Sequence, residues 1–232
     1  TSVQPLSDAL AEAFMAKNPG VKVNVAGGGS GAGIRAAQEG TADIGASSRK
    51  LKPEEEAGLY QTKIAMDGIA VVVHPGNPVS NLTMEQVKKI FAGEIESWDQ
   101  VGGNKAPINV VTREAGSGTR GTFEDLVMGE GNAITPNAVV QTSNGAVRTA
   151  VAGDPNAVGY LSLGAVNEQV KALKIDGVEA TRENVLSGSY KISRPFLYLT
   201  KTEPQGIIKS FIDFALSPEG QQIVATEWIP VK

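Results

Sequence analysis

Along the chain, stretches with apolar residues at helical spacing alternate with stretches in which every second residue is apolar. The first group has the spacing of one helix face and consists of Leu6, Leu10, Ala13 and Phe14. Ser2 stands just ahead of this group, where it can cap the helix. The next stretch, Val21–Val25, alternates apolar and polar residues as a half-buried strand does. Because the two spacings alternate almost to the C-terminus, the pattern predicts an α/β fold in layers.

Two longer apolar runs, at residues 63–73 and 193–200, predict strands that cross between two lobes. We therefore expect a discontinuous first lobe, residues 1–73 and 193–232, and a second lobe, residues 74–192. The pattern is weakest over residues 164–190, where no element is predicted.

A glycine-rich turn, Gly27–Gly33, follows the strand predicted at Val21–Val25 and precedes a short helix. Ser30 supplies a hydroxyl in this turn. No Gly-Lys-Ser/Thr follows, which excludes a Walker A phosphate loop. The turn fits a dinucleotide-binding fingerprint only loosely, since a run of glycines matches many patterns. A flexible linker is the third interpretation, although the regular elements on both sides count against it.

A second turn of this kind lies at Gly116–Thr119, between an apolar strand ending at Val111 and the helical pattern of residues 123–127. Ser117 and Thr119 are candidate helix caps, and the start of a helix with open amides favours an anion. Arg113, just before the turn, can add a planar guanidinium with two parallel donors. The turn predicts an oxyanion site, and the alternative is an ordinary strand–turn–helix with a surface arginine.

Composition narrows the chemistry. The chain has no cysteine, one histidine and a net charge of −4, which argues against thiolate metal sites and a nucleic-acid surface. A catalytic triad could use only His74, which precedes a proline and is better interpreted as a surface residue. The acidic runs at 54–56 and 124–125 are typical of solvated helix faces. The remaining candidates for a functional site are the hydroxyl and amide donors at the strand-to-helix turns, together with one arginine.

Five short motifs along the chain together resemble those of a known family. They are Thr1–Pro5, Gly29–Gly31, Asp43–Ser48, Arg113–Thr119 and Ser143–Gly145. In this order, and over essentially the whole chain, they are similar to the phosphate-binding proteins of bacterial ABC phosphate transporters. The resemblance implies a two-lobed periplasmic-binding-protein fold of type II, with two α/β domains joined by two crossing strands and the ligand in the cleft. It also implies no enzymatic activity, no cofactor and no metal.

The resemblance further implies a set of phosphate ligands. In the first lobe they are the hydroxyls and amides of Thr1, Ser2, Ser30 and Ser48. In the second lobe they are Arg113, Ser117, Gly118 and Thr119. Some relatives carry an aspartate at the position of Ser48, where it accepts a proton from phosphate. We expect Asp67 to take that role, and the alternative is an ordinary hydrogen-bonding residue at the hinge. Relatives also carry a strand and a Gly-Ser pair ahead of Thr1, so we expect the first lobe to lack that strand.

The implied partners are inorganic phosphate and the permease subunits of an ABC importer, with no nucleic acid, for a monomeric protein. The implied location is extracytoplasmic, in the periplasm or at the outer face of the cytoplasmic membrane, and an anchoring lipid outside this chain is left open. Three other functions stay open at this point. They are a binding protein for sulfate, molybdate or tungstate, a nucleotide-dependent enzyme that uses the Gly27 turn, and a phosphate-scavenging surface protein without a transporter.

Overall fold

A computed structural model describes residues 2–232, in which contacts divide the chain into two compact units. Unit 1 comprises Thr1–Asp67 and Arg194–Lys232, and unit 2 comprises Gly68–Ser193. The chain passes between the units within two strands, β2 (Tyr60–Val73) and β9 (Ser193–Thr200). Contacts place the first passage after Asp67, within β2, whereas the sequence predicted it after residue 73. No helix in the described residues has the length and apolarity that crossing a membrane requires.

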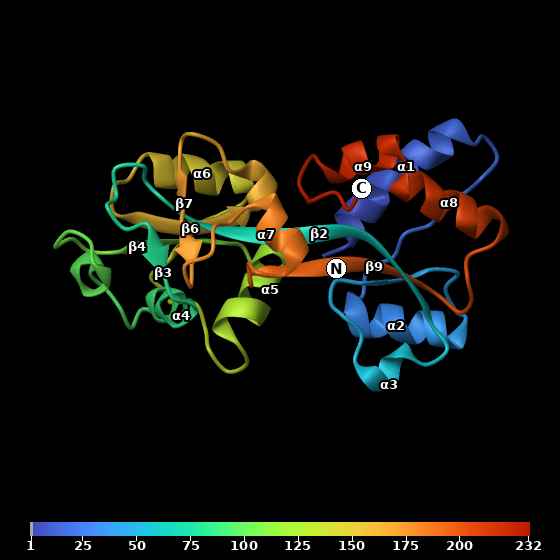
Figure 1. The fold of residues 1–232 in the computed structure, drawn as a ribbon, viewed down its shortest axis with the longest axis horizontal. Coiled ribbons are helices and arrows are strands. Elements are labelled where there is room, and N and C mark those ends of the chain that lie inside the picture. The colour runs from blue at the N-terminus through green and yellow to red at the C-terminus, as the bar shows by residue number, and fades with distance from the viewer. Residues whose placement is uncertain (1) are drawn as a thin grey trace. The chain divides into compact units, whose positions relative to one another are not determined.

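Unit 1 packs helices on both sides of its strands (Figure 1). Besides parts of β2 and β9, its elements are α1 (Gln4–Lys17), α2 (Gly29–Glu39), β1 (Gly45–Ser47), α3 (Pro53–Glu56), α8 (Gly206–Leu216) and α9 (Pro218–Val224). α1, α8 and α9 contact one another on one side of the strands, and α2 covers the other side. The predicted stripe of α1 is buried at Leu6, Leu10 and Phe14, and the Phe14 ring lies 5.3 Å from that of Phe211.

The strand predicted at Val21–Val25 is wrong, although its burial pattern is right. Val21, Val23 and Val25 pack against the core of unit 1, while Lys22 and Asn24 are exposed. Among the described residues, however, the backbone of residues 22–27 makes one hydrogen bond, from the Val23 N–H to Met15 Sδ (3.3 Å). A strand needs a neighbouring strand to bond with, and the alternation of side chains cannot report whether one is there.

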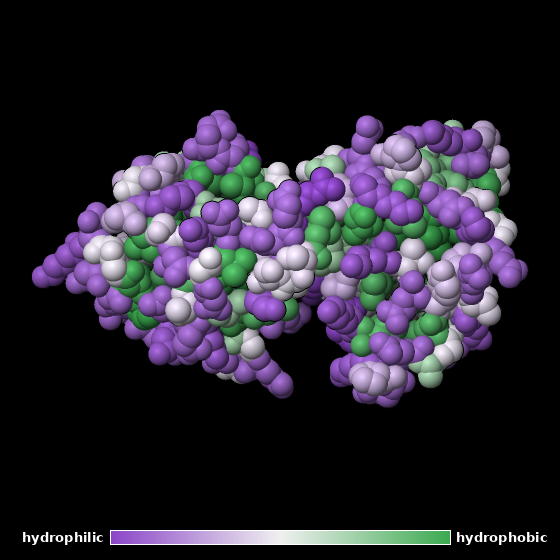
Figure 2. Space-filling view, in the orientation of Figure 1, coloured by the Kyte–Doolittle hydropathy of each residue, from purple (hydrophilic) through white to green (hydrophobic). Residues whose placement is uncertain are grey.

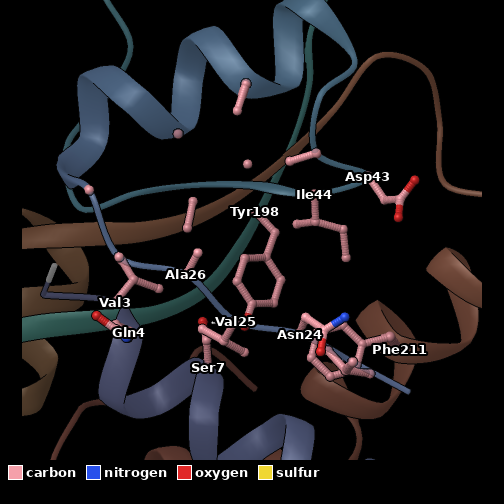
Figure 3. Close-up of a pocket in the computed structure, with 18 of the residues that line it drawn as sticks. Val3, Gln4, Ser7, Asn24, Val25, Ala26, Asp43, Ile44, Tyr198 and Phe211 are labelled. Carbon is pink, nitrogen blue, oxygen red and sulfur yellow. Dashed lines mark hydrogen bonds between the residues drawn. The ribbon is translucent and has the colours of Figure 1, made fainter. Parts of the chain in front are cut away.

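A cavity of about 580 Å³ separates this segment from β1. β1 stands at the end of the strand order β1-β9-β2-β6-β4-β5 and, among the described residues, pairs only with β9. Ile44 and Tyr198 extend into the cavity, and Val3 and Gln4 lie at the start of α1 beside it (Figure 3). Apolar surface is visible between α8 and α2 in the space-filling view (Figure 2). The interior of unit 1 is therefore open along two extended backbone segments.

Unit 2 is built on a sheet that has both parallel and antiparallel strand pairs. Its elements, after the rest of β2, are β3 (Asn81–Leu82), α4 (Met84–Ala92), η1 (Trp98–Val101), β4 (Asn109–Arg113), α5 (Gly118–Phe123), the π-helix η2 (Glu124–Met128), β5 (Val139–Gln141), α6 (Asn144–Ala152), β6 (Ala157–Ser162), η3 (Leu163–Ala165), β7 (Lys171–Ala172), β8 (Lys174–Ile175) and α7 (Arg182–Ser187). β4 pairs in parallel with both β5 and β6, and β2 pairs antiparallel with β6, placing Ile69 opposite Ser162. Residues 164–190, where the sequence predicted no element, contain short strands and α7.

The helix caps show how far local sequence decides these elements. Thr83 and Gln86 form the predicted capping box of α4, with hydrogen bonds of 3.1 and 2.9 Å. Ser117 and Ser143 cap α5 and α6 through their side chains. The cap predicted at Ser2 is wrong, because α1 begins after Val3 and has no side-chain cap. The caps at Thr83 and Ser117 are confirmed, and each joins groups that lie within one turn of each other.

Candidate anion-binding site

Three strand ends of unit 2 meet at one edge of its sheet. Because β5, β4 and β6 are parallel, Gln141, Arg113 and Ser162 end their strands on the same side. In open α/β sheets this edge is where ligands bind. Asn144, at the start of α6, connects two of these ends. Its Oδ1 accepts hydrogen bonds from Arg113 Nη1 and from the Ser162 N–H, both at 3.3 Å.

The guanidinium of Arg113 is held by a carboxylate. Arg113 Nε and Nη2 donate to the two carboxylate oxygens of Glu114 at 3.0 and 3.1 Å. The side chain of Arg113 is 11% exposed and that of Glu114 is 36% exposed. The pairing lowers the pKa of Glu114, chiefly through the hydrogen bond from Arg113, so Glu114 stays charged at neutral pH. The two donors predicted for an anion are thus aimed at an anionic side chain in this structure.

A buried aromatic stack fixes the backbone of Arg113. The hydroxyl of Tyr160 accepts from the Arg113 N–H (3.2 Å) and lies 2.7 Å from Thr112 Oγ1. Burial raises the pKa of Tyr160, so this hydroxyl keeps its proton. The ring of Tyr160 stacks on Phe123 of α5, with centroids 4.1 Å apart. The stack therefore ties the end of β4 to the helix that follows the turn.

The turn between β4 and α5 has the backbone that a helix start requires. Gly116 has φ +94°, a value that glycine adopts without strain. Ser117 is buried, and its Oγ accepts from the Arg120 N–H (3.1 Å). Gly121 N–H makes the first backbone bond of the helix, to the Ser117 carbonyl (2.9 Å). Thr119 lies inside the first turn and is not the cap. The amides of Gly118 and Thr119 precede that first bond and so belong to the group that a helix leaves available.

In unit 1, Ser30 and Ser48 come together from opposite ends of a helix–strand pair. Ser30 stands at the start of α2, and its Oγ accepts from the Ser48 N–H (2.9 Å). The two hydroxyl oxygens lie 3.2 Å apart. Two glycines make this approach possible. A side chain at Gly33 would collide with the Ala46 carbonyl oxygen, and one at Gly45 with the Gly33 carbonyl oxygen, so α2 rests directly on the backbone of β1.

Ser2 is held by a residue from the far end of the chain. Arg194, the first residue of β9 in unit 1, donates from Nη2 to Ser2 Oγ at 2.9 Å. The Arg194 side chain is buried, and Ser2 is half-buried. Pro195 follows and keeps the Arg194 backbone extended. Asp67 lies on β2, next to β9 in the strand order, and is 5% exposed. Thr1 lies outside the described residues.

Three of the predicted ligand serines share one hydrogen-bonding arrangement. In each, the oxygen accepts an N–H: Ser2 from Arg194, Ser30 from Ser48, and Ser117 from Arg120. A hydroxyl has one proton and acts both as donor and as acceptor. With the oxygen engaged by an N–H, the proton of each serine points away from that N–H, and the hydroxyls of Ser30 and Ser48, 3.2 Å apart, offer a further donor between them. The arrangement suits a ligand that presents bare oxygens.

The large cavity of unit 1 has a different character. Its walls are mostly apolar, and among the described residues that line it Ser30 is the one predicted ligand. The hydroxyl and guanidinium groups described above do not converge there. The cavity therefore belongs to the packing of unit 1, and we do not assign the anion to it.

Comparison with known proteins decides the family. A model described as "PBP superfamily domain" matches residues 1–219. Relatives include the phosphate-binding protein PstS of Bacillus subtilis (strain 168), 35% identical over 100% of this chain and 78% of that protein, and PstS of Borreliella burgdorferi, 31% identical over 97% and 85%. The chain belongs to the PstS family of the PBP superfamily.

Solved structures agree with this membership. One is a crystal structure, with bound phosphate, of a proposed phosphate ABC transporter substrate-binding protein from Clostridium perfringens; it is 50% identical, with a TM-score of 0.71 over 100% of this chain and 96% of that one. Another is an ABC-type phosphate transport receptor from Vibrio cholerae, 41% identical, with a TM-score of 0.84 over 99% and 96%. The two-lobed α/β fold expected from the sequence is confirmed.

In this PstS-family chain, four residues around the predicted ligands were missed by the sequence analysis as parts of the site. They are Glu114, Asn144, Tyr160 and Arg194. Asn144 lay in a motif that the sequence analysis used but was not chosen as a ligand. Arg194 had a visible signal, as the one charged residue of the strand predicted at residues 193–200. The sole histidine plays no part here: His74 Nδ1 accepts from the Gly76 N–H (2.9 Å) and closes a turn.

Proposed function

We propose that this PstS-family chain binds inorganic phosphate and delivers it to an ABC importer. The observation that carries the proposal is the shared arrangement of Ser2, Ser30 and Ser117, whose protons are available to the bare oxygens of an anion. Arg113 adds the permanent charge, and the amides of Gly118 and Thr119 add backbone donors. Together with Ser48, Asp67 and Thr1, these are the residues that we propose hold phosphate. The names of the relatives support the choice of phosphate among oxyanions.

Both donor sets are proposed to act on one ligand. The set on unit 1 contains the hydroxyls of Ser2, Ser30 and Ser48, and Arg194 donates to that of Ser2. The set on unit 2 contains Arg113 and the α5 amides. Neither set alone offers enough donors to replace the hydration of a phosphate dianion. Binding through both would favour a closed arrangement of the two lobes, as in hinge-closing receptors.

The proposed role is binding and delivery, not catalysis. The chain is proposed to work as a monomer outside the cytoplasm, at the membrane that holds the permease subunits, with no cofactor. Uptake of phosphate by cells whose own binding protein has been deleted would test delivery. Growth on limiting phosphate should return when this chain is supplied with an export signal, and failure despite tight binding would leave the chain a receptor without this permease.

Isothermal titration calorimetry tests the binding itself. The chain, freed of bound anions by dialysis, is titrated with phosphate, sulfate, molybdate and ATP at pH 7.5. We expect one site that takes phosphate with a dissociation constant in the micromolar range or tighter and takes sulfate at least a hundredfold more weakly. Tighter binding of sulfate or molybdate would reassign the ligand, and binding of ATP with turnover would refute a pure receptor.

A further inference from the structure

Arg194 is a charged residue of unit 1 that contacts Ser2, a proposed phosphate ligand. The proposed function does not yet give Arg194 a role. Its Nη2 lies 2.9 Å from Ser2 Oγ, across 192 positions of sequence. The side chain is 9% exposed. Burying a guanidinium costs free energy unless its N–H groups find partners, and the hydroxyl of Ser2 is one of the partners of Arg194.

The chemistry of the contact is directional. A guanidinium has five N–H donors and no acceptor, so Ser2 can only accept in this bond. The hydroxyl proton of Ser2 must then point away from Arg194. A hydrogen bond accepted from a cation also polarises the O–H group and makes it a stronger donor. Without Arg194, the same hydroxyl could rotate and present its lone pairs to an approaching anion.

We propose that Arg194 is a positioning residue for anion binding, which fixes Ser2 as a hydrogen-bond donor. This inference rests on the proposed function, since it requires that Ser2 contacts the ligand. Ser30 and Ser117 receive the equivalent bond from backbone N–H groups, those of Ser48 and Arg120. Ser2 precedes α1 and does not cap it, so the Arg194 side chain supplies to Ser2 what a backbone N–H supplies to the other two.

A double-mutant cycle measures whether Arg194 acts through Ser2. The variants are Ser2→Ala, Arg194→Met, which keeps the length of the side chain, and the two combined; phosphate affinity is measured by calorimetry for all four proteins. Each single change should weaken binding about tenfold or more, the range for a hydrogen bond to a charged group. In the Ser2→Ala background, Arg194→Met should cost less than a further twofold.

Ser30→Ala is the matched control. It removes a hydroxyl that Arg194 does not touch, so Arg194→Met should keep its full effect in that background. A full effect of Arg194→Met in the Ser2→Ala background would overturn the inference, because Arg194 would then act on the anion directly or through the fold. An effect that vanishes at 1 M salt would also overturn it, since long-range attraction is screened and an oriented contact is screened much less.

Two further measurements keep the test decisive. The melting temperature and the near-ultraviolet circular dichroism of each variant, without phosphate, show whether it is folded. If Arg194→Met does not fold, Arg194→Lys enters the same cycle, because lysine keeps the charge but loses the planar group that sets the direction of the bond. Absence of phosphate binding by the unmodified chain would refute the proposed function, whereas binding with independent effects of Ser2 and Arg194 would refute this inference alone.

Discussion

Glu114 should weaken phosphate binding, because it occupies the donors that Arg113 would give to a ligand. Both carboxylate oxygens accept from the guanidinium, at 3.0 and 3.1 Å. An anion that approaches Arg113 must displace this pair or share the guanidinium with it. Glu114→Gln keeps the size of the side chain and removes its charge. We therefore expect Glu114→Gln to bind phosphate more tightly.

The exposure of the pair sets the size of the effect. Arg113 is nearly buried at 11%, but Glu114 is 36% exposed, so solvent screens the attraction. Ion pairs at the surface contribute about 0.2–1 kcal/mol. Because two parallel hydrogen bonds join Arg113 and Glu114, we place the contribution of this pair at the upper end of that range, about 1 kcal/mol. That corresponds to a dissociation constant about fivefold lower in the variant.

The assay is calorimetry with phosphate at 50 mM and at 1 M salt, where the gain should shrink. Glu124→Gln is the control, because it removes the same charge from a neighbouring pair, with Arg120, that leaves the Arg113 guanidinium untouched. The lowered pKa of Glu114 predicts the pH dependence. The carboxylate stays charged at neutral pH, so the advantage of the variant should hold from pH 8 to about 5. The difference in affinity should disappear only as the pH falls below the ordinary pKa of a glutamate, about 4, where Glu114 gains a proton. Equal or weaker binding by Glu114→Gln would mean that Glu114 holds Arg113 in its productive orientation.

Four further predictions follow from the same residues. Arg113→Ala should weaken phosphate binding by about 2–5 kcal/mol, roughly thirtyfold to several thousandfold, and Arg113→Lys should recover part of this; an unchanged affinity would remove Arg113 from the site. Asp67→Asn should relax the rejection of sulfate more than it harms phosphate binding, because a carboxylate accepts the proton of phosphate and repels sulfate, which has none; competition titration with both anions measures it, and unchanged selectivity would place the proton acceptor elsewhere. Small-angle scattering should show a smaller radius of gyration with saturating phosphate, and identical profiles would contradict closure of two lobes around the ligand. A strand-forming segment fused ahead of Thr1 should raise the melting temperature and the phosphate affinity, because the cavity beside β1 has extended backbone along two of its walls. The control is a fusion of equal length that contains prolines, and equal melting temperatures and affinities of the two fusions would refute this.

The sequence by itself determined what depends on neighbours within a turn or two. The capping box of Thr83, the cap at Ser117 and the apolar face of α1 could all be predicted, because donor and acceptor, or the members of a face, are four residues apart or fewer. The motifs also sufficed to predict the family. They could not say what each ligand residue is bonded to.

Tertiary structure decided the pairings between distant segments. Val21–Val25 has the alternation of a strand, but alternation reports which side chains face the core and not whether a neighbouring strand is within bonding distance. Ser2 and Arg194, far apart in the sequence, meet only because β9 returns the chain to the start of α1. Arg113 could be predicted as an anion ligand from its residue type. Its bonds to Asn144 and Tyr160 depend on the parallel order of β5, β4 and β6, which only long-range packing sets.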